Sequence, residues 1–149
     1  MGRAKAVVDV GVLASAAEEL WYDTRRWPTF VDGLAHVDKV EGDWPRAGRI
    51  VWDSKPGGRG RVVERVLEHE ARTGQTVAVE DGKITGTQRI AFEPTDHGCR
   101  ISLTLDYDVK QRRPLMPVFD LLFLRRPMND SLKRTLVRFS RELDAADGL

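Results

Sequence analysis

The amino-acid sequence predicts an α+β fold in which one long C-terminal helix covers an antiparallel sheet. Through most of residues 1–109, apolar side chains alternate with polar ones, as in strands with one buried face. Clusters of turn residues separate these stretches at intervals of roughly 10 to 15 residues, which indicates hairpin connections. Over residues 132–143, apolar side chains instead recur with helical spacing. At 149 residues, the chain is expected to form one domain over 1–149.

The N-terminal segment is expected to form one strand and two short helices. Valines alternate with other residues near the start, which predicts a half-buried strand. Ser15, with Glu18 three residues later, is typical of a capping box at a helix N-terminus. Proline disfavours helical geometry in the residue before it, so the Trp27-Pro28 pair interrupts this helical stretch. The predicted bounds are 8–12 for the strand, and 16–23 and 28–32 for the helices.

Six further strands are expected before residue 109, joined as an antiparallel meander. Asp81-Gly82 is a strong hairpin dipeptide, and residues 42–45, 55–58 and 94–98 are rich in other turn formers. The predicted strands span 35–41, 48–54, 61–71, 75–80, 85–93 and 100–109.

The last third of the chain predicts one long helix beginning at about residue 115. Spacings of four, three and four place four apolar residues on one helix face, namely Leu132, Leu136, Phe139 and Leu143. Pro117 belongs near the first turn, whereas Pro127 is expected to kink or split the helix. The apolar helix face would cover the apolar face of the sheet.

Composition and charge exclude several classes of protein. The net charge of +1 provides no overall field that would select nucleic acid or a membrane surface. This balance conceals an acidic excess in residues 1–109 and a basic excess in residues 110–149. The longest apolar stretch, 121–124, is far shorter than the roughly 20 residues that a membrane span needs. The N-terminus lacks the apolar segment of a signal peptide, so a cytoplasmic location is expected.

No metal site, intramolecular disulfide or cofactor is expected. The single cysteine, Cys99, has no partner, and the three histidines are too scattered for metal-ligand spacing. None of the histidines is placed beside a candidate nucleophile. The sequence therefore identifies no catalytic residue and leaves open whether the protein is an enzyme.

Four phrases, in their order along the chain, resemble a known superfamily. They are SAAEELWYDTRRWPTF, RVVERVLEHEA, RIAFEPTDHGCRISLTLDYDV and RRPMNDSLKRTLVRFSREL, and together they extend over almost the whole chain. The chain resembles the START-like or helix-grip superfamily, also called SRPBCC, and within it the polyketide cyclase/dehydrase-like branch. The resemblance implies a curved seven-stranded antiparallel sheet gripping the C-terminal helix, with an apolar cavity between them. In that superfamily the cavity holds lipids, sterols, polyketides, quinones or other hydrophobic molecules.

This resemblance leaves three functions open, because a fold does not fix a function. The first is binding, or transport, of a hydrophobic small molecule. The second is a cyclase, aromatase or dehydratase that acts on a polyketide-like substrate. The third is an interaction protein whose basic C-terminal helix, including Arg134 and Arg138, contacts an anionic protein partner. The helix lacks interleaved exposed aromatic residues, which argues against nucleic acid.

Alternation selects the residues expected to line the cavity. Tyr107 would point inward and offer its hydroxyl to a ligand oxygen, or else lie at the rim or anchor the helix. Gln88 would present its amide to the cavity, although a strand-end glutamine is as often exposed to solvent. The apolar lining is expected to be Trp52, Ile90, Phe92, Leu103 and Leu105 from the sheet, with Phe119 and Phe123 from the helix.

The strand over residues 61–71 has two faces that are harder to assign. One face carries Val62, Glu64 and Val66, followed by two more glutamates, and this number of carboxylates favours solvent. The other face would then point inward and bring Arg65 into the cavity as a clamp for an anion or a carbonyl group. The alternatives are that the register is reversed, or that Arg65 forms a surface ion pair with Glu64 or Glu80.

Overall fold

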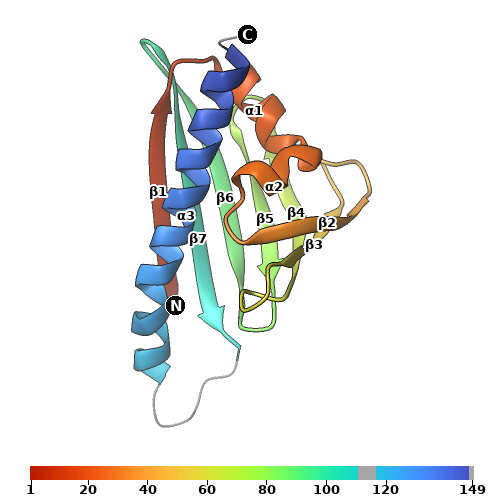
Figure 1. Ribbon diagram of the computed structural model, residues 1–149, viewed down its shortest axis with the longest axis vertical. Coiled ribbons are helices and arrows are strands. Elements are labelled where there is room, and N and C mark those ends of the chain that lie inside the picture. The colour runs from red at the N-terminus through yellow and green to blue at the C-terminus, as the bar shows by residue number, and fades with distance from the viewer. Residues whose placement is uncertain (111–116, 148–149) are drawn as a thin grey trace.

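The computed structural model describes the backbone of residues 1–110 and 117–147, and the side chains of residues 1–110 and 125–146 (Figure 1). Its elements follow the predicted order of one strand, short helices, six strands and one long helix. They are β1 (Gly2–Val10), α1 (Ala14–Tyr22), the 3₁₀ turn η1 (Thr24–Arg26), α2 (Trp27–Phe30), β2 (Leu34–Glu41), β3 (Arg49–Ser54), β4 (Arg61–Glu70), β5 (Gly74–Glu80), β6 (Ile84–Thr95), β7 (Gly98–Val109) and α3 (Pro117–Asp147).

The seven strands form one antiparallel sheet in the order β1-β7-β6-β5-β4-β3-β2. The first strand therefore pairs with the last one, with Gly2 opposite Tyr107 and Val10 opposite Cys99. Helix α3 runs along β1 and β7, and α1 and α2 lie beside its C-terminal half (Figure 1). The predicted α+β helix-grip architecture is confirmed.

The start of α1 differs from the prediction. The helix begins at Ala14, one residue before the expected cap, and no side chain caps its N-terminus. The carboxylate of Glu18 instead accepts a hydrogen bond from the backbone N–H of Arg72 at 2.6 Å. Arg72 has a positive φ of 61° in the turn after β4, and Glu18 supplies its N–H with a partner. Glu18 therefore stabilises the turn after β4 and takes no part in capping α1.

The predicted apolar face of α3 forms one side of the core, against the inner face of the sheet. Leu132, Leu136, Phe139 and Leu143 are all buried, which confirms the helical spacing. The Phe139 ring lies edge-on to two other aromatic rings, 5.4 Å from Trp21 and 5.1 Å from Phe30. Aromatic pairs at this separation add to the stabilisation from buried area. The cluster fixes α1 and α2 against α3.

Helix α3 continues through Pro127 as one element, so of the predicted kink or split at this residue the split is wrong and the kink stays a prediction. Among the residues that the structure describes, no helix is both long enough and apolar enough to cross a bilayer.

Candidate functional site

A chamber of about 40 Å³ lies between the inner face of the sheet and α3, near the short helices. It can hold small polar groups or a water molecule but is much smaller than the roughly 300–1,000 Å³ of a typical ligand pocket. Aromatic and aliphatic side chains form part of its wall, and charged or polar groups form the remainder. The lining residues are Trp21, Trp27, Val31, Asp32, Arg59, Glu64, Gln88, Leu103, Ser131, Leu132 and Thr135.

Glu64 is the buried carboxyl group of the chamber, with 6% of the residue exposed. It lies on β4 beside Trp52 of β3, whose indole Nε1 donates a hydrogen bond to Glu64 Oε2 at 2.6 Å. Burial raises the pKa of Glu64 above its ordinary value, although the bond from Trp52 and the charge of Arg59 act in the opposite direction. The neutral carboxyl form is therefore favoured more than in an exposed glutamate.

Arg59 reaches the chamber from the loop between β3 and β4. Its Nε donates a hydrogen bond to Asp81 Oδ2 at 2.7 Å, and its guanidinium carbon lies 5.5 Å from the centroid of the Trp52 ring. Asp81 is held in turn by the backbone N–H groups of Lys83 and Ile84, at 2.7 and 2.9 Å. Arg59 Nη2 is buried and has no hydrogen-bond partner among the described residues. The guanidinium is thus fixed in place while one donor stays unused.

The raised pKa of Glu64 predicts a specific pH dependence of stability. Between its ordinary pKa of 4.5 and the raised value, the folded state binds more protons than the unfolded state. The free energy of unfolding should therefore fall as pH rises through this interval and level off above it. Glu64→Gln removes this titration but retains an acceptor for Trp52. The free energy of unfolding of the wild type minus that of the variant should therefore decrease across the same interval. Urea unfolding of both proteins from pH 4 upward measures the difference, and a pH-independent difference would contradict it.

Asp32 also lines the chamber and connects the turn between α2 and β2 to α3. From the turn between α2 and β2, it accepts hydrogen bonds from Ser131 at 2.8 Å, Arg134 at 3.0 Å and Arg138 at 3.1 Å. Its own N–H donates to Thr135 Oγ1 at 2.9 Å. Burial opposes ionisation, but the bonds from Arg134 and Ser131 outweigh it and hold the pKa of Asp32 below its ordinary value. We call these five residues the Asp32 clasp.

The Asp32 clasp includes both arginines that were expected to contact an anionic protein partner. Arg134 and Arg138 both lie on α3, yet each is already paired with the carboxylate of Asp32. Their role in binding a partner remains a prediction.

The predicted lining residues from the sheet lie on its inner face, at different distances from the chamber. Gln88 and Leu103 line it, and Trp52 is buried and contacts Glu64. Ile90, Phe92, Leu105 and Tyr107 are buried in the core outside the chamber's lining. Phe119 and Phe123 fall outside the residues whose side chains are described.

Tyr107 is buried, and its hydroxyl has no hydrogen-bond partner among the described residues. The ring occupies the space where a side chain on Gly2 would lie, since a Cβ there would approach the ring to 2.5 Å. Burial raises the pKa of the phenol, although the charge of Arg125 acts against it. A glycine in β1 therefore makes room for Tyr107.

The inward orientation predicted for Arg65 is wrong, because Arg65 is exposed and Glu64 points inward. A bulge interrupts the pairing of β4 with β5 between Val66 and Glu68. Beyond it the alternation reverses, so both Glu68 and Glu70 are exposed. The carboxylates that suggested a solvent-facing side therefore do not share one face with Glu64.

No pattern in the sequence marks Arg59, Asp32 or Asp81 as a site residue. A lone arginine within the glycine-rich stretch 56–60 is the one local signal for Arg59. Asp32 meets its arginines only across more than 100 residues of sequence, and Asp81 appears as a simple turn former. The contacts that bring these three residues into the site form only in the tertiary fold.

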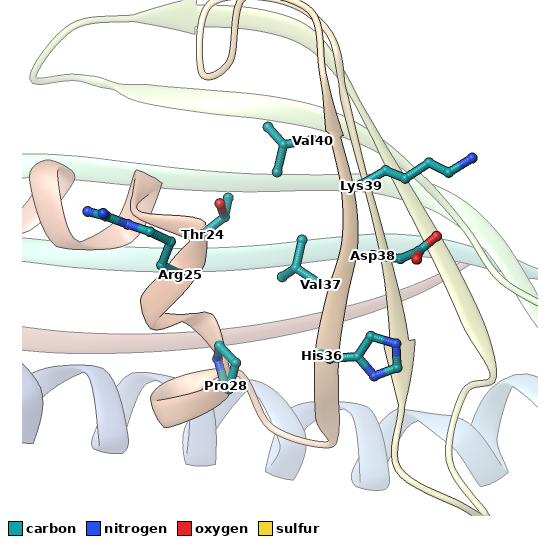
Figure 2. Close-up of a pocket in the computed structure, with 8 residues that line it drawn as sticks. All are labelled: Thr24, Arg25, Pro28, His36, Val37, Asp38, Lys39 and Val40. Atoms are coloured by element: carbon teal, nitrogen blue, oxygen red, sulfur yellow. The ribbon is translucent and has the colours of Figure 1, made fainter.

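A second, open pocket lies on the outside of the molecule, between η1 and the edge strand β2. Figure 2 shows Val37 and Val40 pointing toward the segment that carries Thr24, while His36 and Lys39 point to the other side of β2. Its volume is about 350 Å³. His36 Nε2 lies 3.0 Å from Asp53 Oδ2, on the side of β2 that faces away from this pocket. The chamber contains a buried carboxyl group and a guanidinium donor with no partner among the described residues, whereas His36 and Lys39 point away from this groove, so the chamber is the better candidate site.

A seven-stranded antiparallel sheet around a long C-terminal helix, with a chamber between them, defines the START-like class of proteins. Within this class the chain belongs to the family described as polyketide cyclase / dehydrase and lipid transport, whose model matches residues 1–144. No curated protein matches the chain at the level of sequence.

Solved structures show the same fold at low sequence identity. A protein from Thermus thermophilus has a TM-score of 0.80 and 16% identity, covering 97% of this chain and 98% of its own. A START superfamily protein from Mycobacterium smegmatis has a TM-score of 0.78 and 12% identity, covering 98% and 99%. The di-domain ARO/CYC StfQ of the steffimycin biosynthetic pathway has a TM-score of 0.77 and 15% identity, covering 99% of this chain and 52% of its own. These similarities establish the fold.

Proposed function

We propose that the protein binds a small hydrophobic molecule between the sheet and α3, as a binding or transport protein. The main supporting observation is that Arg59, Glu64 and Gln88 converge on one chamber whose remaining sheet-side and helix-side walls include Leu103 and Leu132. An apolar enclosure with a few polar groups is the usual form of a small-molecule site. Membership of a family that includes lipid transport agrees with this proposal. Cytoplasmic location and a single domain over 1–149 remain predictions.

The size of the chamber implies that one wall moves when a ligand binds. At about 40 Å³, it accommodates a polar head group but not the apolar body of a lipid or polyketide. The Asp32 clasp joins the α2–β2 turn to α3 through polar contacts, which water can replace once they open. We propose that a ligand enters where this clasp separates.

Filling the chamber should weaken binding. Gln88→Phe places a ring in the chamber from the sheet, and we expect at least about tenfold weaker uptake of the neutral dye Nile red. Thr87→Phe is the matched control, because Thr87 is exposed on the opposite face of β6. Dye fluorescence titrations, with native mass spectrometry of copurified ligand, measure the effect. Equal uptake by both variants would place the binding site elsewhere.

Catalysis on a polyketide-like substrate is a second candidate function, as a cyclase, aromatase or dehydratase. Glu64 favours it, because a titratable group with a raised pKa inside a chamber is suited to proton transfer. Glu64→Gln should then stop ring closure or water loss from a reactive poly-β-ketone while a non-reactive ketone still binds. Unchanged turnover in this variant would exclude the role.

A further inference from the structure

The sheet side of the chamber holds two potential hydrogen-bond donors. Arg59 Nη2 is buried and lacks a partner among the described residues. Glu64 Oε2 accepts the indole N–H of Trp52, so the proton of a neutral Glu64 is best placed on Oε1. Both Arg59 and Glu64 line the chamber. A ligand atom in the chamber can therefore meet an N–H group of Arg59 and, when Glu64 is neutral, its O–H group.

The charged groups around these two donors are paired with groups of opposite charge. Asp81, with a side chain 1% exposed, holds Arg59 in an ion pair at 2.7 Å. Burial raises the pKa of Glu64 and favours its neutral form. The other carboxylate lining the chamber is Asp32, which is paired with Arg134 and Arg138. With Glu64 neutral, the donor end of the chamber is therefore close to electrically neutral while it still offers two hydrogens.

We propose that Arg59 and Glu64 form a head site for a neutral carbonyl oxygen, such as that of a ketone, aldehyde or ester, on a hydrophobic ligand. This proposal rests on the proposed function, binding in the chamber. A carbonyl oxygen has two lone pairs for the two donors and brings no charge. A carboxylate would place an additional negative charge beside the Arg59–Asp81 pair, and burying a charge without its own partner is costly.

Three probes with chains of equal length test this selectivity, namely 2-nonanone, nonane and nonanoate. Relative to partition of each probe from water into hexane, which has no donors, we expect the full chain to favour 2-nonanone over nonane about tenfold, because the chamber supplies hydrogen bonds to the carbonyl that hexane cannot. The ketone should also bind more tightly than nonanoate. With ¹³C at the carbonyl, the resonance of bound 2-nonanone should lie downfield of its position in hexane, since hydrogen-bond donors polarise the carbonyl group.

The pH dependence of binding identifies Glu64 as one donor. As pH rises through the pKa of Glu64, its carboxyl loses the proton that it donates, so affinity for 2-nonanone should fall. The Trp52 indole does not titrate, and the neighbouring carboxylates Asp81 and Asp32 are each in an ion pair with an arginine. Glu64→Gln keeps an N–H donor at the same place. It should therefore bind the ketone with little dependence on pH.

Removing the second donor requires a control for folding. Arg59→Met should reduce ketone affinity about tenfold and leave nonane affinity unchanged. Arg65→Met is the matched control, because Arg65 is exposed on the outer face of β4. If Arg59→Met does not fold, the ¹³C shift and the pH profiles of wild type and Glu64→Gln still decide the question.

The outcomes separate the two proposals. Ketone selectivity with a pH dependence that Glu64→Gln removes supports the head site. No preference for 2-nonanone over nonane relative to their hexane partition, or tightest binding of nonanoate, would overturn the head site and leave chamber binding intact. If none of the probes and no dye binds, both proposals fail.

Discussion

Phe139→Ala is expected to lower the free energy of unfolding by about 3–5 kcal/mol, the usual cost of truncating a buried phenylalanine. Phe139 is fully buried and contacts the rings of Trp21 and Phe30, which belong to two different short helices. Removing the ring leaves a cavity where α1, α2 and α3 meet. Urea unfolding followed by circular dichroism measures the loss as a shift in midpoint.

Val137→Ala provides the control for this prediction. Val137 lies two residues away on α3 but is 46% exposed, so its truncation should change stability by no more than about 0.5 kcal/mol. If Phe139→Ala cost no more than Val137→Ala, the aromatic cluster would not be the element that joins the three helices.

Asp81→Ala is expected to have the second large effect, near the lower end of the about 3–5 kcal/mol associated with breaking a buried ion pair. The side chain accepts hydrogen bonds from Arg59 and from the backbone N–H groups of Lys83 and Ile84. Its loss leaves these donors without an acceptor. Arg59 retains partial access to solvent, with 28% of its side chain exposed, which reduces the cost.

Asp96→Ala is a suitable comparison, because Asp96 also lies in a hairpin turn, between β6 and β7, but is exposed. Its substitution should change thermal and urea stability little. Asp81→Asn, which retains an acceptor without the charge, should lie between the two. Because Asp81 orients Arg59, both Asp81 variants should also weaken ketone binding. Similar stability of Asp81→Ala and Asp96→Ala would contradict the role of Asp81.

The periodic parts of the fold could be predicted from the sequence. The helical spacing identified the buried face of α3 correctly, including Phe139. Clean alternation likewise placed Leu103, Leu105 and Tyr107 on the inner face of β7. In both elements a single regular period runs through the whole stretch, so each residue supports the assignment of the next.

The candidate site was harder to predict because it depends on interruptions and on distant contacts. The bulge in β4 reverses the alternation, so a count of carboxylates along the strand gave Glu64 the wrong face. Burial of Glu64 is tolerated because Trp52 from the neighbouring strand supplies a donor. Arg59 comes from an aperiodic loop, and its partner Asp81 lies 22 residues further on. Local patterns carry no information about such pairs.

The pairing of β1 with β7 also determines how the chain must fold. Its paired residues, such as Arg3 and Asp106, are separated by 103 residues, so this seam is one of the most non-local contacts in the sheet. Folding rates fall as contacts become more distant in sequence, and the seam should therefore form late. Until it forms, β7 presents an open edge that the β1 of another copy fits equally well. The same register that completes the monomer thus provides a route to a strand-swapped dimer at high protein concentration.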